Sequence, residues 1–187
     1  MVKLSDNNAY KRGQELLDSG MCREAIAQFD EFLAQQPDSW KAINSKGFAF
    51  QKMSKYTEAV ECFDKALAIN PKSVEVLNNK GVTLSMRGLY KEAIACFEQA
   101  FANDPTSLEA LNGKAIALQH MFLFKEALDV LQQAYQVDPK HPQTLLSIAV
   151  TLQKLKQYER AIGYFKRFWL LINPMLKPGM VSALPIS

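Results

Sequence analysis

The side chains that most often do chemistry in proteins are few in this sequence and widely spaced. Its 187 residues include three cysteines, Cys22, Cys62 and Cys96, and two histidines, His120 and His141. The cysteines form no CxxC pair, and no histidine stands at the spacing that a zinc site or a Cys-His catalytic pair requires. The sequence also lacks a glycine-rich phosphate loop and a nucleophile motif. We therefore predict a protein that is not an enzyme, with no catalytic residue, no metal and no cofactor.

Composition and the cysteine count predict where such a protein works. The chain is 48% hydrophobic and 22% charged, which is typical of a folded globular protein. Its longest purely apolar run, residues 168–172, is far shorter than the roughly 20 residues of a membrane span. The first ten residues turn polar within five, unlike a signal peptide, and an odd number of cysteines favours reduced thiols. We expect a cytoplasmic protein without a membrane span.

The net charge of +3 is too small to indicate a nucleic-acid or membrane partner. The charge is unevenly spread, because residues 140–187 carry seven Lys and Arg side chains against the single acid Glu159. This basic end either meets an acidic partner or is a solvated helix face beside a Lys-containing tail.

The chain repeats itself every 34 residues. Three columns carry the period, one of proline, one of alanine and one that is mostly phenylalanine. The proline column is Pro37, Pro71, Pro105 and Pro139, with Pro174 after 35 residues; the alanine column is Ala25, Ala59, Ala93, Ala127 and Ala161; the third column is Phe29, Phe63, Phe97, Leu131 and Phe165. Five repeats account for the chain from residue 6 to about residue 175.

Each repeat contains two amphipathic helices. In the second repeat, apolar residues recur at steps of three and four over residues 40–50 and again over residues 56–67, with a break at Ser54-Lys55. Asn70-Pro71 then ends the second helix, since proline cannot continue it. Small residues share one column of the first helix, where they let two helices approach closely. That column is Gly13, Gly47, Gly81, Ala115 and Ala149.

These columns resemble the tetratricopeptide repeat family, whose pattern is W-x2-L-G-x2-Y, then A-x3-F, then P. The second repeat matches it with Gly47-x2-Phe50, Ala59-x3-Phe63 and Pro71. The resemblance implies an all-α fold, a right-handed superhelical solenoid of antiparallel helix pairs. It implies one array over residues 6–175, with a short tail at 176–187. The expected repeats are 6–39, 40–73, 74–107, 108–141 and 142–175. The run Asn79-Lys80-Gly81 resembles prokaryotic members.

One column departs from the family pattern. The leucine position of the motif holds a long basic side chain in four repeats and an apolar one in the fifth. The column reads Arg12, Lys46, Lys80, Lys114 and Ile148. Long basic side chains bury their stems and keep the charge in water, so we interpret the column as structural, with a ligand clamp as the alternative.

In family members the first helix of each pair lines a concave groove that holds a peptide. Carried onto this chain, that arrangement implies a partner-binding groove of polar and apolar side chains. Its residues are Lys41, Asn44, Phe48, Gln51, Asn78, Asn79, Val82, Asn112, Ile116, Gln119 and Val150. A row of amides beside a row of apolar residues suits an extended peptide, because an amide both donates to and accepts from a peptide backbone. The alternative is that these residues only solvate an idle face.

The predicted function is a non-enzymatic scaffold that binds a peptide or partner protein in this groove. The alternative is a self-assembling module that associates through its uncapped last repeat, for example as a homodimer. The residues for that alternative are Phe122, Leu123, Trp169 and Ile172, which the repeat's own core does not require.

Overall fold

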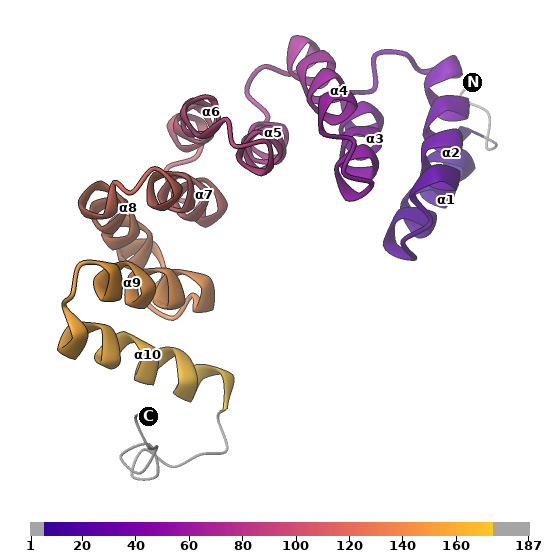
Figure 1. Cartoon of the computed structure of the whole chain (residues 1–187). Helices are drawn as coiled ribbons and strands as arrows, with labels where there is room; N and C mark the ends of the chain where they lie inside the picture. The colour runs from indigo at the N-terminus through magenta and orange to yellow at the C-terminus, as the bar shows by residue number, and fades with distance from the viewer. Residues whose placement is uncertain (1–5, 174–187) are drawn as a thin grey trace. The chain divides into compact units, whose positions relative to one another are not determined.

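A computed structural model describes residues 6–173, which form ten α-helices and no strand (Figure 1). The expected Pro174 column member, residue 175 and the tail at 176–187 lie outside the described residues. The helices are α1 (Asp6–Asp18), α2 (Cys22–Gln35), α3 (Trp40–Lys52), α4 (Tyr56–Ile69), α5 (Val74–Met86), α6 (Tyr90–Asn103), α7 (Leu108–His120), α8 (Phe124–Val137), α9 (Pro142–Lys154) and α10 (Tyr158–Ile172). Each expected repeat therefore holds one helix pair. We call the odd-numbered helices A helices and the even-numbered ones B helices.

The turn inside each pair has the same backbone conformation. The second residue before each B helix adopts a left-handed φ, which is 78° at Gly20 and 76° at Gly88. Ser54, Phe122 and Lys156 take φ values of 59°, 62° and 60° at the same position. This left-handed residue ends the A helix in the way that glycine does at most helix C-termini. The chain can then reverse within three residues.

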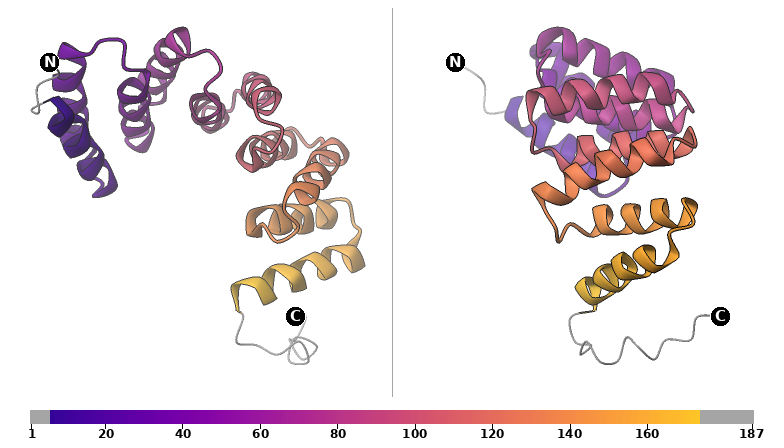
Figure 2. Two further views of the ribbon diagram at one scale, coloured as in Figure 1. Left: turned by 180° about the vertical axis from the view of Figure 1, so that it is seen from behind. Right: turned by 90° about the vertical axis from the view of Figure 1, so that its left-hand side faces the viewer.

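Two compact units make up the structure, one ending at Pro105 and one beginning at Thr106. Within the first unit, each helix from α1 to α6 packs against the next, and α3 also contacts both α1 and α5. Within the second unit, α7 to α10 pack in the same sequential way, and α7 also contacts α9. In each unit the A helices thus lie along one side, which we call the A-helix face. Figure 2 shows the hairpins from two further directions.

Glycine in the A helices permits close packing in the first unit. A Cβ atom on Gly47 would lie 2.8 Å from a ring atom of Phe63, and one on Gly81 would lie 2.7 Å from a ring atom of Phe97. Both phenylalanines are almost completely buried. The glycine column therefore makes room for the phenylalanine column of the partner helix, as the sequence predicts.

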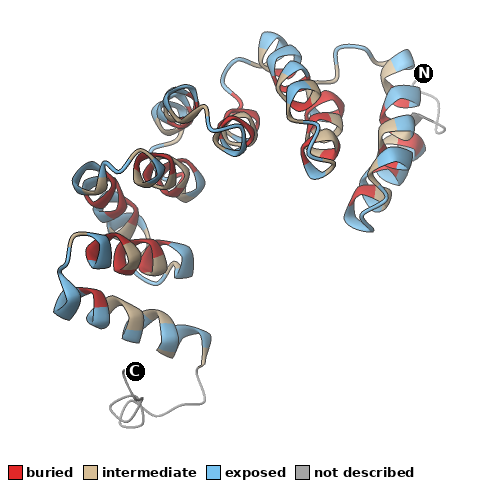
Figure 3. Ribbon diagram, viewed as in Figure 1, coloured by how far each residue is buried: buried red, intermediate tan, exposed pale blue. Residues whose placement is uncertain are grey.

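The last helix is the least buried part of the second unit. In α10 only Ala161 is buried, whereas α8 buries five residues (Figure 3). The expected all-α architecture of antiparallel helix pairs is confirmed. The expectation of a single array from residue 6 to residue 175 stays a prediction.

Candidate protein-binding surface

The A-helix face of the first unit contains a hollow of about 200 Å³. Three successive A helices supply its lining, which is Leu17 from α1, Asn44, Ser45 and Phe48 from α3, and Glu75 and Asn79 from α5. Small-molecule sites measure about 300–1,000 Å³, so this hollow is of a size for one side chain of a bound protein segment.

Hydrogen bonds join α3 to α5 across this hollow. The Asn44 amide nitrogen donates to a carboxylate oxygen of Glu75 at 2.7 Å, and the Asn79 amide nitrogen donates to the Asn44 oxygen at 3.1 Å. Asn44 is buried, with only 3% of its surface exposed, while Glu75 is exposed. The carboxylate therefore stands at the mouth of the hollow with one oxygen held by Asn44.

Two lysines of α3 lie beside aromatic rings of the same helix. The Lys52 ammonium lies 5.2 Å from the centre of the Phe48 ring, and the Lys41 ammonium lies 5.7 Å from that of Trp40. Cation–π contacts of this length hold a charge beside an apolar surface. Lys41 and Lys52 are exposed, so the surface beside the hollow combines positive charge with Phe48.

The A-helix face of the second unit also carries an amide network. The Asn112 amide nitrogen donates to the Thr144 hydroxyl at 2.9 Å, and it also donates to the carbonyl of Leu108 at 2.8 Å. Gln119 donates to the Thr151 hydroxyl at 2.7 Å. The bonds to Thr144 and Thr151 join α7 to α9, because each reaches a residue about one repeat further along the chain, whereas the bond to Leu108 lies within α7. The amides thus hold consecutive A helices together.

The structure separates the groove residues of the sequence analysis into two groups. Asn44, Gln51 and Asn112 are buried, and Gln51 contacts the Met86 sulfur at 3.9 Å. The other members reach the surface in part or in full. Lys41 and Val82 are exposed, and Phe48, Asn78, Asn79, Ile116, Gln119 and Val150 are half-buried. Peptide binding by these residues stays a prediction.

Three residues of the hollow lie outside the set that the sequence indicates most strongly, namely Leu17, Ser45 and Glu75. Ser45 and Glu75 lie on the A helices of their repeats, so their positions in the repeat could have indicated them as groove residues. Leu17 gave no such signal, since a leucine near the end of an amphipathic helix is equally expected in the core.

The residues of the self-association alternative are all exposed to solvent. Phe122 has 79% of its surface exposed, and its ring meets that of Phe124 edge-on, at 6.1 Å between centres. Leu123 is 37% exposed, Trp169 39% and Ile172 48%. Association through them stays a prediction.

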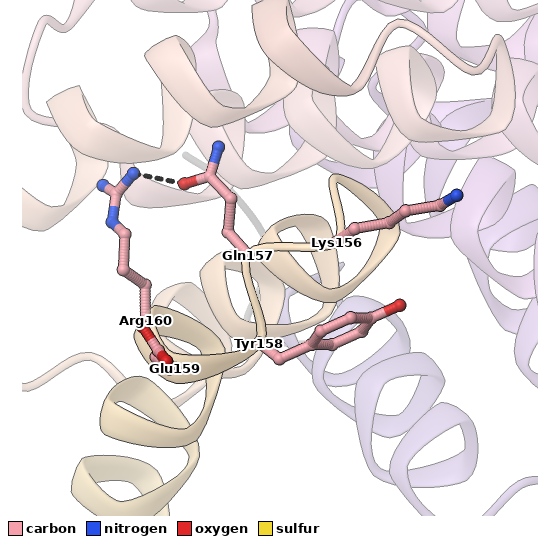
Figure 4. Close-up of a pocket in the computed structure, with 5 residues that line it drawn as sticks. All are labelled: Lys156, Gln157, Tyr158, Glu159 and Arg160. Atoms are coloured by element: carbon pink, nitrogen blue, oxygen red, sulfur yellow. Dashed lines mark hydrogen bonds between the residues drawn. The ribbon is translucent and has the colours of Figure 1, made fainter.

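A second hollow, of about 360 Å³, lies at the turn between α9 and α10. Five consecutive residues, Lys156 to Arg160, line it, and Figure 4 shows Gln157 and Arg160 on one side with Lys156 and Tyr158 on the other. The Arg160 guanidinium donates to the Gln157 side-chain oxygen. All five residues are exposed, and a single connection supplies them, so this hollow lacks the convergent groups of a built site.

Burial affects two of the three cysteine thiols. All three cysteines have free thiols, and burial raises the pKa of both the Cys62 and the Cys96 thiol. A raised pKa keeps a thiol protonated and unreactive. Over residues 6–173 no three His, Cys, Asp or Glu side chains are placed to hold a metal ion. Nor does any helix in that range have the length and apolarity to cross a membrane.

Sequence comparisons agree with the repeat pattern. Two models of the tetratricopeptide repeat match residues 10–50 and 40–106, and a model of subunit 3 of the anaphase-promoting complex, or cyclosome, matches residues 86–168. No curated protein matches the chain. The chain belongs to the tetratricopeptide repeat family, as its sequence indicates.

Solved structures show the same fold. MamA of Desulfovibrio magneticus RS-1, in a form running from residue 41 to its end, is 19% identical, with a TM-score of 0.81 over 95% of this chain and 100% of that one. PilF of Pseudomonas aeruginosa is 23% identical, with a TM-score of 0.80 over 87% of this chain and 74% of that one. At these identities the likeness concerns the fold alone.

The class of the protein follows from the family and from the A-helix faces. Stacked helix pairs of this kind present extended surfaces to other proteins. The chain is therefore a protein-interaction scaffold, and members of its repeat family are in general non-catalytic.

Proposed function

We propose that the A-helix face of the first unit binds an extended segment of a partner protein. The observation that carries this proposal is the hollow between α1, α3 and α5, which brings an apolar wall, a hydroxyl and a carboxylate together. Phe48 and Leu17 offer apolar contact to one side chain of the segment. Glu75 and Asn79 lie where they can accept hydrogen bonds from its backbone or from a basic side chain.

The apolar column beside the amides extends the proposed surface. Val82 follows the hollow on α5, while Ile116 and Val150 hold the equivalent positions on the separate A-helix face of the second unit. The buried amides Asn44 and Asn112 support the face by fixing the spacing of the A helices. In this proposal the partner contacts Phe48, Glu75 and Asn79, which are at least partly exposed.

Selection from a phage-displayed library of random 12-residue peptides on the immobilised full chain tests the proposal. We expect selected peptides to carry an apolar residue beside Lys or Arg. Their affinity should fall at least about tenfold for Phe48→Ala, since buried aromatic anchors dominate peptide binding. Glu75→Gln should weaken the same peptides by severalfold.

Lys125→Ala serves as the control, because Lys125 is an exposed residue of the B helix α8. Circular dichroism and thermal unfolding establish that each variant is folded. Peptides that bind Phe48→Ala and Glu75→Gln as well as they bind the natural chain would place the binding surface elsewhere.

A further inference from the structure

Helix α10 bears an apolar stripe that the proposed peptide site does not use. Its residues follow each other at steps of four and three, so they fall on one side of the helix. They are Tyr158, Ile162, Phe165, Trp169 and Ile172, which we call the α10 face. Ile162 is 39% exposed, whereas Leu128, which holds the same position in α8, is only 8% exposed. Figure 3 shows how little of α10 is buried.

The same face of other B helices is covered by the next A helix. Helix α2 packs against α3, α4 against α5 and α8 against α9. Among residues 6–173 no A helix follows α10. The outer side of a terminal repeat is normally polar, because it faces water.

The end of α10 is more apolar than the ends of the other B helices. Its last residue, Ile172, takes the place of the polar residue that caps α2, α4, α6 and α8. Those capping residues are Gln36, Asn70, Asp104 and Asp138. Because α10 has 15 residues where the others have 14, the stripe is extended by one apolar position. This terminal helix is thus lengthened in a way that favours a covering partner.

An ion pair marks how an A helix sits on the B helix before it. In the first unit Lys46 on α3 pairs with Asp30 on α2, and Lys80 on α5 pairs with Asp64 on α4. Both pairs join the same two positions of the repeat, an acid on the B helix and a base on the A helix. On its own B helix the acid lies beside the apolar stripe, four residues after the position that Ile162 holds in α10.

The residue at the acid's position in α10 has the opposite charge. The position of Asp30 and Asp64 is held in α10 by Lys166, which is exposed. A helix that packs there as an A helix would bring its own residue at the Lys46 position against an ammonium group. We propose that the α10 face binds an amphipathic helix of another protein, with Asp or Glu at the position that Lys46 holds in α3.

The positive charge of Lys166 also disfavours the binding of a second copy of this chain to the α10 face. End-to-end stacking would place α1 on α10, and α1 carries Arg12 at the position of Lys46. Like charges at an interface reduce association. A two-fold pair of α10 helices would set Lys166 of each copy along the same seam. Residues 174–187 contain Lys177 and no acidic side chain, so they offer no carboxylate side chain to Lys166.

A charge-swap experiment with the full chain tests the proposal. The probe is a fluorescein-labelled synthetic peptide with the sequence of residues 40–73, made with Lys46 and with Lys46→Glu. Removed from the array, its A helix lacks the B helix that normally covers it. Fluorescence anisotropy should show the Lys46→Glu peptide binding the natural chain about twofold to fivefold more tightly than the Lys46 peptide, which is the upper part of the range for one solvent-exposed pair.

Two variants of the chain locate the effect. Lys166→Glu should reverse the preference between the two peptides, and Trp169→Ala should weaken both by at least about tenfold. Arg160→Glu is the matched control, because it makes the same charge change on the opposite side of α10 and should leave the preference unchanged.

Several results would overturn the proposal. They are equal affinity of both peptides for the natural and the Lys166→Glu chains, no binding by either peptide, and a preference that Arg160→Glu also reverses. A dimer in light scattering that Trp169→Ala disperses would assign the face to a second copy. A tenfold gain in peptide affinity from Met180→Asp with Val181→Asp would assign it to the chain's own last residues.

Discussion

The two units solve the same packing problem with different side chains. In the first unit the A helix offers glycine to a buried phenylalanine, as at Gly47 and Gly81. In the second, the pair α7–α8 holds Ala115 and Leu131 at these positions, both fully buried, while the pair α9–α10 holds Ala149 and the half-buried Phe165. In α7 and α8 the methyl group gained on one helix is matched by a smaller side chain on the other. In that pair, complementary volume is kept although both residues differ.

The units also differ in how consecutive repeats are joined. The first unit uses partly exposed ion pairs, Lys46 with Asp30 and Lys80 with Asp64. The second unit places Gln132 and Ile148 at these positions. Both units also join their A helices through a buried amide, Asn44 with Glu75 in the first and Asn112 with Thr144 in the second. Charge pairs in water are screened by salt, while buried hydrogen bonds are not. We therefore expect the two units to respond differently to salt and to pH.

The largest effect on stability should come from Gly81→Ala alone, which gives the first unit the alanine that α7 holds at this position. Gly81→Ala places a methyl group within 2.7 Å of the Phe97 ring, so it should lower the free energy of unfolding by about 1–3 kcal/mol. Adding Phe97→Leu, which copies the Ala115 and Leu131 combination, should recover part of that loss. Urea unfolding of the two single variants and the double variant measures the coupling.

Gly163 in α10 supplies a control of opposite sign. No atom lies within 4 Å of a Cβ built on it, so Gly163→Ala should stabilise the helix by up to about 1 kcal/mol through higher helix propensity. If Gly81→Ala stabilised the chain as Gly163→Ala does, close packing against Phe97 would not explain the glycine column.

A smaller effect should follow from removing an ion pair of the first unit. Lys80→Met keeps most of the aliphatic stem but removes the charge facing Asp64. Since the side chain of Lys80 is 23% exposed and that of Asp64 55%, the loss should be at most about 1 kcal/mol at low salt. In 1 M salt the loss should shrink, because the Debye length is then only about 3 Å.

Lys125→Met on α8 is the comparison for the second unit, where we expect almost no change at either salt concentration. Thermal unfolding at both salt concentrations measures the difference. A loss for Lys80→Met that persists undiminished in 1 M salt would assign the role of Lys80 to the packing of its stem rather than to its charge.

The smallest effect concerns alkaline pH and again separates the units. Burial raises the pKa of the Cys62 and Cys96 thiols from the ordinary value of 9.0, with Lys46 and Lys80 opposing that rise. A thiol whose pKa is higher in the folded state stabilises the fold fully below the unfolded pKa. That contribution is lost as the pH rises through the folded pKa. The first unit should therefore lose stability above about pH 9.

The second unit has Val130 at the position of these thiols. Replacing both, as Cys62→Val with Cys96→Val, should flatten the decline in melting temperature between pH 8 and pH 10.5. An equally steep decline in the double variant would assign the alkaline sensitivity to other groups.

The repeat period, the helix pairs and the close-packing columns could all be predicted from the sequence. Their signals are local, because an amphipathic stripe, a turn residue and a proline act within a few residues of themselves. Gly47 and Phe63 were predictable partners because a fixed period brings the same two columns together in every repeat. The role of Asn44 and Asn112 was not predictable in this way, since polar residues at that spacing suit an open groove and a buried network equally.

What the sequence by itself determined is therefore the fold class, the pairing of helices within each repeat and the side of each helix that packs. Only the tertiary structure decided that the amides of Asn44 and Asn112 are turned toward the next A helix, that Glu75 stands at the mouth of the hollow, and how far the stripe of α10 is exposed within residues 6–173. The physical reason is that hydrogen-bond partners and burial depend on residues about one repeat away in the chain. Their geometry is set by how neighbouring helices cross, and the spacing of residues along one helix does not contain it.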